Sequence, residues 1–154
     1  MIIAVLMLGL AAGLRTVMPL AAVSVAAFLG WIDLGATWAA FVGHPITTVI
    51  LVVLALGELW GDKQPSTPSR LMPQALIGRI VSGALAGLVV SLPTGNPWLG
   101  LVLGAVMAAA GSYGGHAARM RLAAALKRDL PAALIEDAVA IVLAFAAVGL
   151  ALGA

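Results

Sequence analysis

The sequence predicts an all-α integral membrane protein, a compact bundle of about five transmembrane helices. Of its 154 residues, 63% are hydrophobic and only 9% are charged, whereas soluble chains are about 45–50% apolar and about 25% charged. So few charges cannot cover a water-facing surface. There is no cysteine, which excludes a disulfide scaffold and a thiol-based site.

Five apolar stretches, separated by polar or Pro/Gly-rich interruptions, are the predicted spans of a single domain covering residues 1–154. They are 2–30, 45–60, 75–92, 97–115 and 131–152, each judged against the about 20 apolar residues that cross the hydrocarbon. Three of them open with a proline (Pro45, Pro97 and Pro131), which suits the first helical turn. The first stretch is too long, and lacks a preceding basic residue, to be a cleaved signal peptide.

Arg15 divides the first stretch, and two geometries fit it. In one, a long helix is kinked near Pro19, because this proline removes the N–H that would bond to the Arg15 carbonyl. A guanidinium at the bilayer centre costs about 2.5–3.5 kcal/mol, so Arg15 then needs a carboxylate, with Glu136 or Glu58 as the natural candidates. In the other geometry, residues 1–14 form a half-length helix, the crossing helix covers 16–32, and Arg15 lies at the cytoplasmic surface.

Basic residues are distributed on one side of the predicted topology. Seven of the eight lie in or beside the loops after the second and fourth spans: Lys63, Arg70, Arg79, Arg119, Arg121, Lys127 and Arg128. Short cytoplasmic loops collect Lys and Arg, so we expect a multi-pass protein with its N-terminus on the cytoplasmic side and its C-terminus on the opposite, periplasmic side. The bilayer and its anionic lipid headgroups are the expected partners, and nucleic acid is not.

Glycine pairs at spacing four predict close helix packing. The pairs are Gly9/Gly13, Gly57/Gly61, Gly83/Gly87, Gly100/Gly104, Gly111/Gly115 and Gly149/Gly153. Small residues on one helix face let backbones approach closely in lipid. We expect most of these contacts to lie within one bundle, with homo-oligomer contacts as the alternative.

Ionisable residues near the cytoplasmic face form the candidate site. Glu58 and Asp62 are four residues apart and would share a helix face, and Glu136 and Asp137 lie in the inner part of the last span. The predicted ligand or ion-pair cluster comprises Arg15, Glu58, Asp62, Lys63, Arg70, Arg79, Glu136 and Asp137. Pro65 and Pro68 stiffen the loop that carries Lys63 and Arg70. No metal site, cofactor or catalytic residue is expected, because the two histidines, His44 and His116, fall on opposite sides.

Three stretches of the sequence resemble a known protein family. The stretch ELWGDKQPSTPSRLMPQALIGRIVSGALAG (residues 58–87), with GLRTVMPLAAVS near the start and LIEDAVAI in the last helix, resembles a domain-of-unknown-function family of small bacterial inner-membrane proteins. That family carries an Asp-Lys-x-Pro and Thr-Pro-Ser-Arg loop motif. The resemblance covers most of the chain and implies no activity.

Three functions remain after this reading. The leading one is a non-catalytic membrane module whose charged cluster binds a partner, a lipid headgroup or a small ligand. The alternative is translocation of an ion, proton or small solute through a dimeric bundle, because ionisable residues inside a membrane are functional by default. A lipid-modifying enzyme ranks last, since no nucleophile elbow, phosphate loop or metal-ligand spacing is present.

Overall fold

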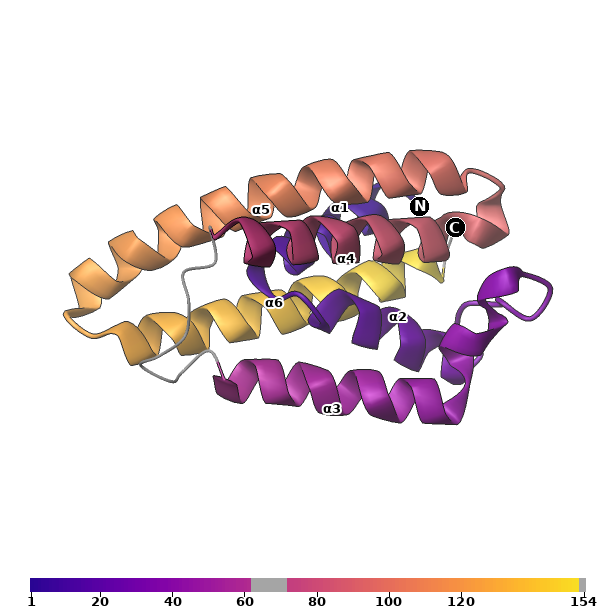
Figure 1. The fold of residues 1–154 in the computed structure, drawn as a ribbon, viewed down its shortest axis with the longest axis horizontal. Helices are drawn as coiled ribbons and strands as arrows, with labels where there is room; N and C mark the ends of the chain where they lie inside the picture. The colour runs from indigo at the N-terminus through magenta and orange to yellow at the C-terminus, as the bar shows by residue number, and fades with distance from the viewer. Residues whose placement is uncertain (62–71, 153–154) are drawn as a thin grey trace.

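The computed structural model describes residues 1–61 and 72–152, which fold as a bundle of helices (Figure 1). The elements are α1 (Ile2–Leu14), α2 (Met18–Phe28), the 3-10 helix η1 (Trp38–Gly43), α3 (Pro45–Gly61), α4 (Pro73–Ser91), the 3-10 helix η2 (Leu92–Thr94), α5 (Pro97–Leu126) and α6 (Asp129–Ala151). No strand occurs in the described ranges, and the predicted all-α class is confirmed. Three segments are long and apolar enough to cross a membrane by length and composition: Pro73–Thr94, α5 and α6.

Helix starts follow the prolines closely, while one helix end was underestimated. Pro45 and Pro97 open α3 and α5 as predicted, and α6 begins slightly before Pro131, at Asp129. The α5 helix runs on to Leu126 rather than ending near residue 115. Residues 116–126 are mostly alanine, leucine, arginine and methionine, which are strong helix formers, so nothing stops the helix before Lys127, whose φ of 52° ends it.

The first predicted span is interrupted rather than kinked. The α1 helix ends at Leu14, Arg15 has extended backbone angles (φ −139°, ψ 118°), and α2 begins at Met18. At 1.5 Å per residue, α1 and α2 are roughly 20 and 17 Å long, shorter than the about 30 Å hydrocarbon core. Pro19 lies in the first turn of α2, where proline starts a helix instead of bending one.

The chain reverses direction at this break. Met1, Trp31, Thr94 and Ala151 line one small cavity, so the start of α1, the exit of α2 and the end of α6 lie at the same end of the bundle. We call this the terminal end, and Figure 1 shows both termini there. The opposite end, where Lys127 and Arg128 join α5 to α6, is the basic end. The expectation that the termini face opposite sides of a membrane assumed that residues 2–30 cross once as a single helix, and the break between α1 and α2 does not agree with that assumption.

This arrangement predicts the result of a topology experiment. In whole cells, reporters fused before Met1 and after Ala151 should both report the same side of the membrane. A reporter inserted between Lys127 and Arg128 should report the opposite side. A pair of terminal reporters on opposite sides would contradict the reversal at Arg15.

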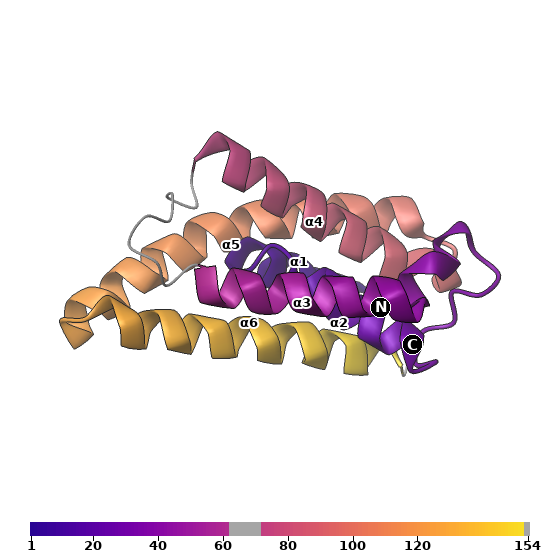
Figure 2. The ribbon, with the colours of Figure 1, turned by 60° about the horizontal axis from the view of Figure 1, so that its bottom comes forward.

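The α1 helix is the centre of the bundle, lying between α5 and α6 in two views (Figures 1 and 2). Its Ala4, Val5, Leu8, Ala11 and Ala12 are all buried. A short apolar helix with no exposed polar face can lie here because its neighbours, and not lipid, surround it. Its polar ends must therefore find their partners inside the protein.

Glycines set the spacing between α1, α4 and α5. An added Cβ at Gly104 would lie 2.1 Å from the Gly83 carbonyl oxygen, and one at Gly87 would lie 2.2 Å from the Gly100 oxygen. Gly9 and Gly13 of α1 face α5 just as closely. These glycine pairs thus pack within one bundle, as predicted. Gly57, Gly61 and Gly149 have no atom within 4 Å of an added Cβ, so these three glycines do not contribute to this packing.

The α3 helix is the least buried long helix. Only Thr48 and Ala55 of its residues are buried, and it packs mainly on α2 (Figures 1 and 2). Ser24 of α2 bridges the two helices, donating to the Val42 carbonyl (2.5 Å) and lying 3.0 Å from the Thr48 hydroxyl. The rest of α3 presents apolar side chains outward, as expected of a lipid-facing surface.

Candidate functional site

The break between α1 and α2 is the polar centre of the protein. A helix end leaves backbone carbonyls or N–H groups without helical partners, and here two such ends meet inside the bundle. A Cβ added at Gly13 would contact Ser112 of α5. At 1.5 Å per residue, Ser112 lies roughly 22 Å along α5 from its start at Pro97. Ser112 lies about midway along α5, so the break lies inside the bundle, far from both of its ends.

Glu58 of α3 binds the free backbone N–H groups just before the start of α2. Its carboxylate accepts hydrogen bonds from the backbone N–H groups of Thr16 (2.5 Å) and Val17 (2.8 Å). The N-terminal end of a helix carries a partial positive charge and binds anions. A carboxylate of this chain thus occupies the position where a helix N-terminus would hold a bound anion.

Arg79 of α4 satisfies the end of α1 in the complementary way. Its guanidinium donates to the carbonyl oxygens of Gly13 (2.6 Å) and Leu14 (2.8 Å). The C-terminal end of a helix carries a partial negative charge and favours a cation. One turn further along α4, Ser82 donates its hydroxyl to the Thr16 carbonyl, so α4 bonds to both sides of the break.

Arg15, at the break itself, is fully buried and forms an ion pair with Asp137 of α6. The expected partners were Glu136 or Glu58, and the structure assigns both of them elsewhere. Glu136 and Asp137 are consecutive on a helix and point about 100° apart. Asp137 consequently faces the break, while Glu136 faces α5.

Glu136 belongs to a second charged group, at the interface of α5 and α6. Arg119 donates to Glu136 (3.4 Å) and forms two hydrogen bonds with the Asp129 carboxylate (3.1 and 2.7 Å). The Asp129 side chain is 67% exposed, so this part of the group is screened by solvent and contributes little stability. The group of Arg119, Asp129 and Glu136 joins α5 to α6 close to their connecting turn.

The predicted cluster is thus divided in two. Arg15, Glu58, Arg79 and Asp137 meet at the break, whereas Glu136 lies in the Arg119 group. Asp62, Lys63, Arg70, Pro65 and Pro68 lie outside the described residues.

Sequence reasoning missed three participants. Ser82 follows Arg79 by three residues and so shares its helix face, a spacing that was available in the sequence. Arg119 was treated as a loop charge, and Asp129 was not singled out. Their pairing required knowing that α5 continues past residue 115, which places Arg119 beside the first turn of α6.

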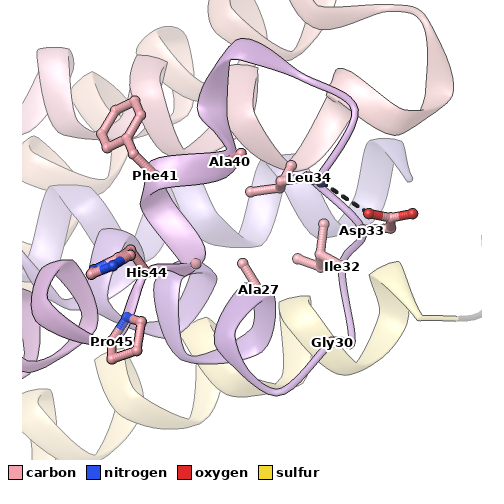
Figure 3. Close-up of a pocket in the computed structure, with 11 residues that line it drawn as sticks. Ala27, Gly30, Ile32, Asp33, Leu34, Ala40, Phe41, His44 and Pro45 are labelled. Atoms are coloured by element: carbon pink, nitrogen blue, oxygen red, sulfur yellow. Dashed lines mark hydrogen bonds between the residues drawn. The ribbon is translucent and has the colours of Figure 1, made fainter.

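A larger cavity lies away from this cluster, at the terminal end. It has a volume of about 710 Å³ and lies between the end of α2 and the η1 connection. Figure 3 shows His44 and Phe41 on one side of it and Asp33 on the other, with Asp33 bonded to the Gly35 N–H (2.9 Å). The acid and the imidazole do not converge. In residues 1–61 and 72–152, no group of three or more His, Asp or Glu side chains is arranged to hold a metal ion.

The contacts at the break are ion pairs and charge-assisted hydrogen bonds between separate helices. Glu58 comes from α3, Arg79 from α4 and Asp137 from α6. Such bonds are stronger than neutral ones, and each couples the position of one helix to the two ends at the break. A change of charge at any of these side chains would therefore act on several helices at once.

Comparisons with known proteins place the chain in a family. No curated protein and no solved structure matches it. One family model, described as a domain of unknown function (DUF4126), matches residues 2–153. The match covers nearly the whole chain, including α1, the break and every charged residue that contacts it. This small helical membrane protein belongs to the DUF4126 family.

Proposed function

We propose that the protein binds a small ion or polar solute at the break between α1 and α2 and translocates it across the membrane. The supporting observation is the interrupted segment itself, whose two helix ends lie buried between charged side chains of α3, α4 and α6. Backbone that leaves the helix at membrane depth is tolerated only inside protein or beside a water-filled cavity. In transporters, such interrupted helices form the substrate site.

The chemistry of the site supports an ionic or polar substrate. The Glu58 carboxylate accepts hydrogen bonds from two backbone N–H groups, which would equally bind an anionic group of a solute. The carbonyl groups that Arg79 binds would equally bind a cation. Glu58 is carried by the helix with the fewest buried residues. Displacing α3 would disturb less packing than displacing any of the central helices.

A non-catalytic membrane module is the second candidate. One observation favours it: each charged side chain at the break contacts another group of the same chain, so the cluster already serves to hold the helices together. In this case the charges stabilise the interruption, and a partner or lipid binds elsewhere. Neither candidate includes an enzymatic step.

We also propose an orientation in a bacterial inner membrane. The basic end would face the cytoplasm by the positive-inside rule, which places both termini in the periplasm. Trp31, Trp38 and Trp98 then lie near the outer boundary, where amphipathic rings are enriched.

Flux measurements in liposomes separate the two candidates. Native protein should move protons or small ions down an imposed gradient, and Glu58→Gln should lower this flux at least about tenfold, because the amide cannot carry the charge that the N–H groups bind. Asp33→Asn is the matched control, since Asp33 is an exposed carboxylate outside the cluster, and its flux should stay native. Absence of flux from the native protein under every gradient would overturn translocation and leave the module.

A further inference from the structure

We infer that a crevice between α5 and α6 binds the part of one acyl chain nearest the headgroup of an anionic phospholipid, with the headgroup held at the α5–α6 turn. This site is next to the break, since Leu14 contributes to both, but the inference does not depend on the translocation proposal. It rests on three observations: the crevice, its depth and the cations next to it.

The crevice is apolar and open to the surrounding lipid. It has a volume of about 130 Å³ and is lined on α5 by Gly115, Ala118 and Leu122 and on α6 by Ala132, Ile135 and Val139, with Leu14 also contributing. Ile135 and Val139 are 46% and 44% exposed, so the crevice opens outward rather than into the core. Arg119 and Glu136 bond to each other across it, and they leave the remainder of its wall to aliphatic groups.

The depth of the crevice suits the part of a lipid that joins its chains to its headgroup. Counted from Pro97 at 1.5 Å per residue, residue 117 of α5 lies roughly 30 Å away, which is the thickness of the hydrocarbon core. The crevice spans residues 115–122 of α5, so a core that begins at Pro97 would end at the crevice. The remainder of α5 and the first turn of α6 would then lie at headgroup level.

Two cations lie in the turn next to the crevice. Lys127 and Arg128 join α5 to α6, five residues after Leu122 and four residues before Ala132, both of which line the crevice. Both side chains belong to exposed residues. Among the described residues they form no ion pair, in contrast to Arg119, which is held by Asp129 and Glu136.

This combination favours an anionic phospholipid over other occupants. A free phosphate would need only the cations, and a neutral lipid would need only the crevice. Basic pockets between helices at the cytoplasmic side bind anionic headgroups, and the apolar crevice next to the turn gives the attached chain a place to pack. The cations of the turn thus adjoin an apolar crevice, as the charged headgroup of a lipid adjoins its acyl chains.

Lipid retention in nanodiscs or by native mass spectrometry tests the site, with phosphatidylglycerol compared with phosphatidylcholine. Native protein should retain the anionic lipid at least about tenfold more strongly, since each basic residue near the surface contributes about 1 kcal/mol. The Lys127→Gln/Arg128→Gln variant should reduce this preference toward unity. Arg121→Gln is the control for charge, because Arg121 is exposed and points about 100° away from Leu122 on α5, and it should retain most of the preference.

A second variant tests the crevice with the cations intact. Ile135→Trp should fill it and lower retention of the anionic lipid at least about fivefold, whereas Ile77→Trp, at a 61% exposed position of α4, should leave retention unchanged. Equal retention of both lipids by native protein would overturn the inference. So would native-like preference in both the turn variant and the Ile135→Trp variant.

Discussion

Replacing Asp137 with leucine is expected to destabilise the protein by about 3–5 kcal/mol, because it leaves the buried Arg15 guanidinium facing an apolar side chain. Arg15 is fully buried and its ion pair with Asp137 lies among the central helices. Unfolding in mixed detergent micelles, followed by circular dichroism, gives the free energy. Asp33→Leu removes an exposed carboxylate instead and should change the stability by less than about 1 kcal/mol.

The double variant Arg15→Leu/Asp137→Leu makes this prediction specific to the pair. Removing both charges avoids an uncompensated buried cation, so the double variant should be more stable than Asp137→Leu alone. A double variant less stable than the single one would show that Arg15 acts independently of Asp137.

Replacing Gly104 with valine should have a comparably large effect through packing. The added Cβ would lie 2.1 Å from the Gly83 carbonyl oxygen, and backbone atoms of α4 cannot move aside as a flexible side chain can. Separating α4 from α5 would also disturb α1, which contacts the same face at Gly9. We expect a loss of about 3 kcal/mol or more, at the upper end of overpacking effects, measured by the same unfolding experiment.

Gly149→Ala is the matched control for this substitution. Nothing lies within 4 Å of an added Cβ at Gly149, and alanine is favoured over glycine in a helix by about 1 kcal/mol. The control should therefore be as stable as native protein or slightly more stable. Similar losses at both positions would indicate that glycine serves helix flexibility rather than close packing.

The sequence predicted the fold class and the close packing because both follow from composition and local spacing. Low charge, apolar stretches and glycine pairs are properties of neighbouring residues, and Gly83, Gly87, Gly100 and Gly104 pack as their spacing indicated. The starts of α3 and α5 were likewise marked by Pro45 and Pro97.

The reversal at Arg15 was not predicted, although the same proline rule applies to it. Of the two geometries considered, the half-length helix over residues 1–14 agrees with α1, which ends at Leu14, but it placed Arg15 at the surface, whereas Arg15 is fully buried. The other geometry interpreted Pro19 as a kink, whereas this proline begins α2 as Pro45 begins α3. Choosing between these readings requires knowing that Glu58 and Arg79, which are distant in sequence, satisfy the exposed backbone groups. The ion-pair partner of Arg15 was missed for a related reason, since it depends on the rotation of α6.

The central position of α1 has a consequence for how the protein is made. This helix precedes α4, α5 and α6 in the chain, so it leaves the ribosome before the segments that surround it (Figure 2). With only 13 residues, it is too short to be held in the bilayer as a crossing helix. Its final burial must therefore wait until α6 has emerged, so a chain truncated before Asp137 should leave its first helix undocked and exposed to membrane proteases.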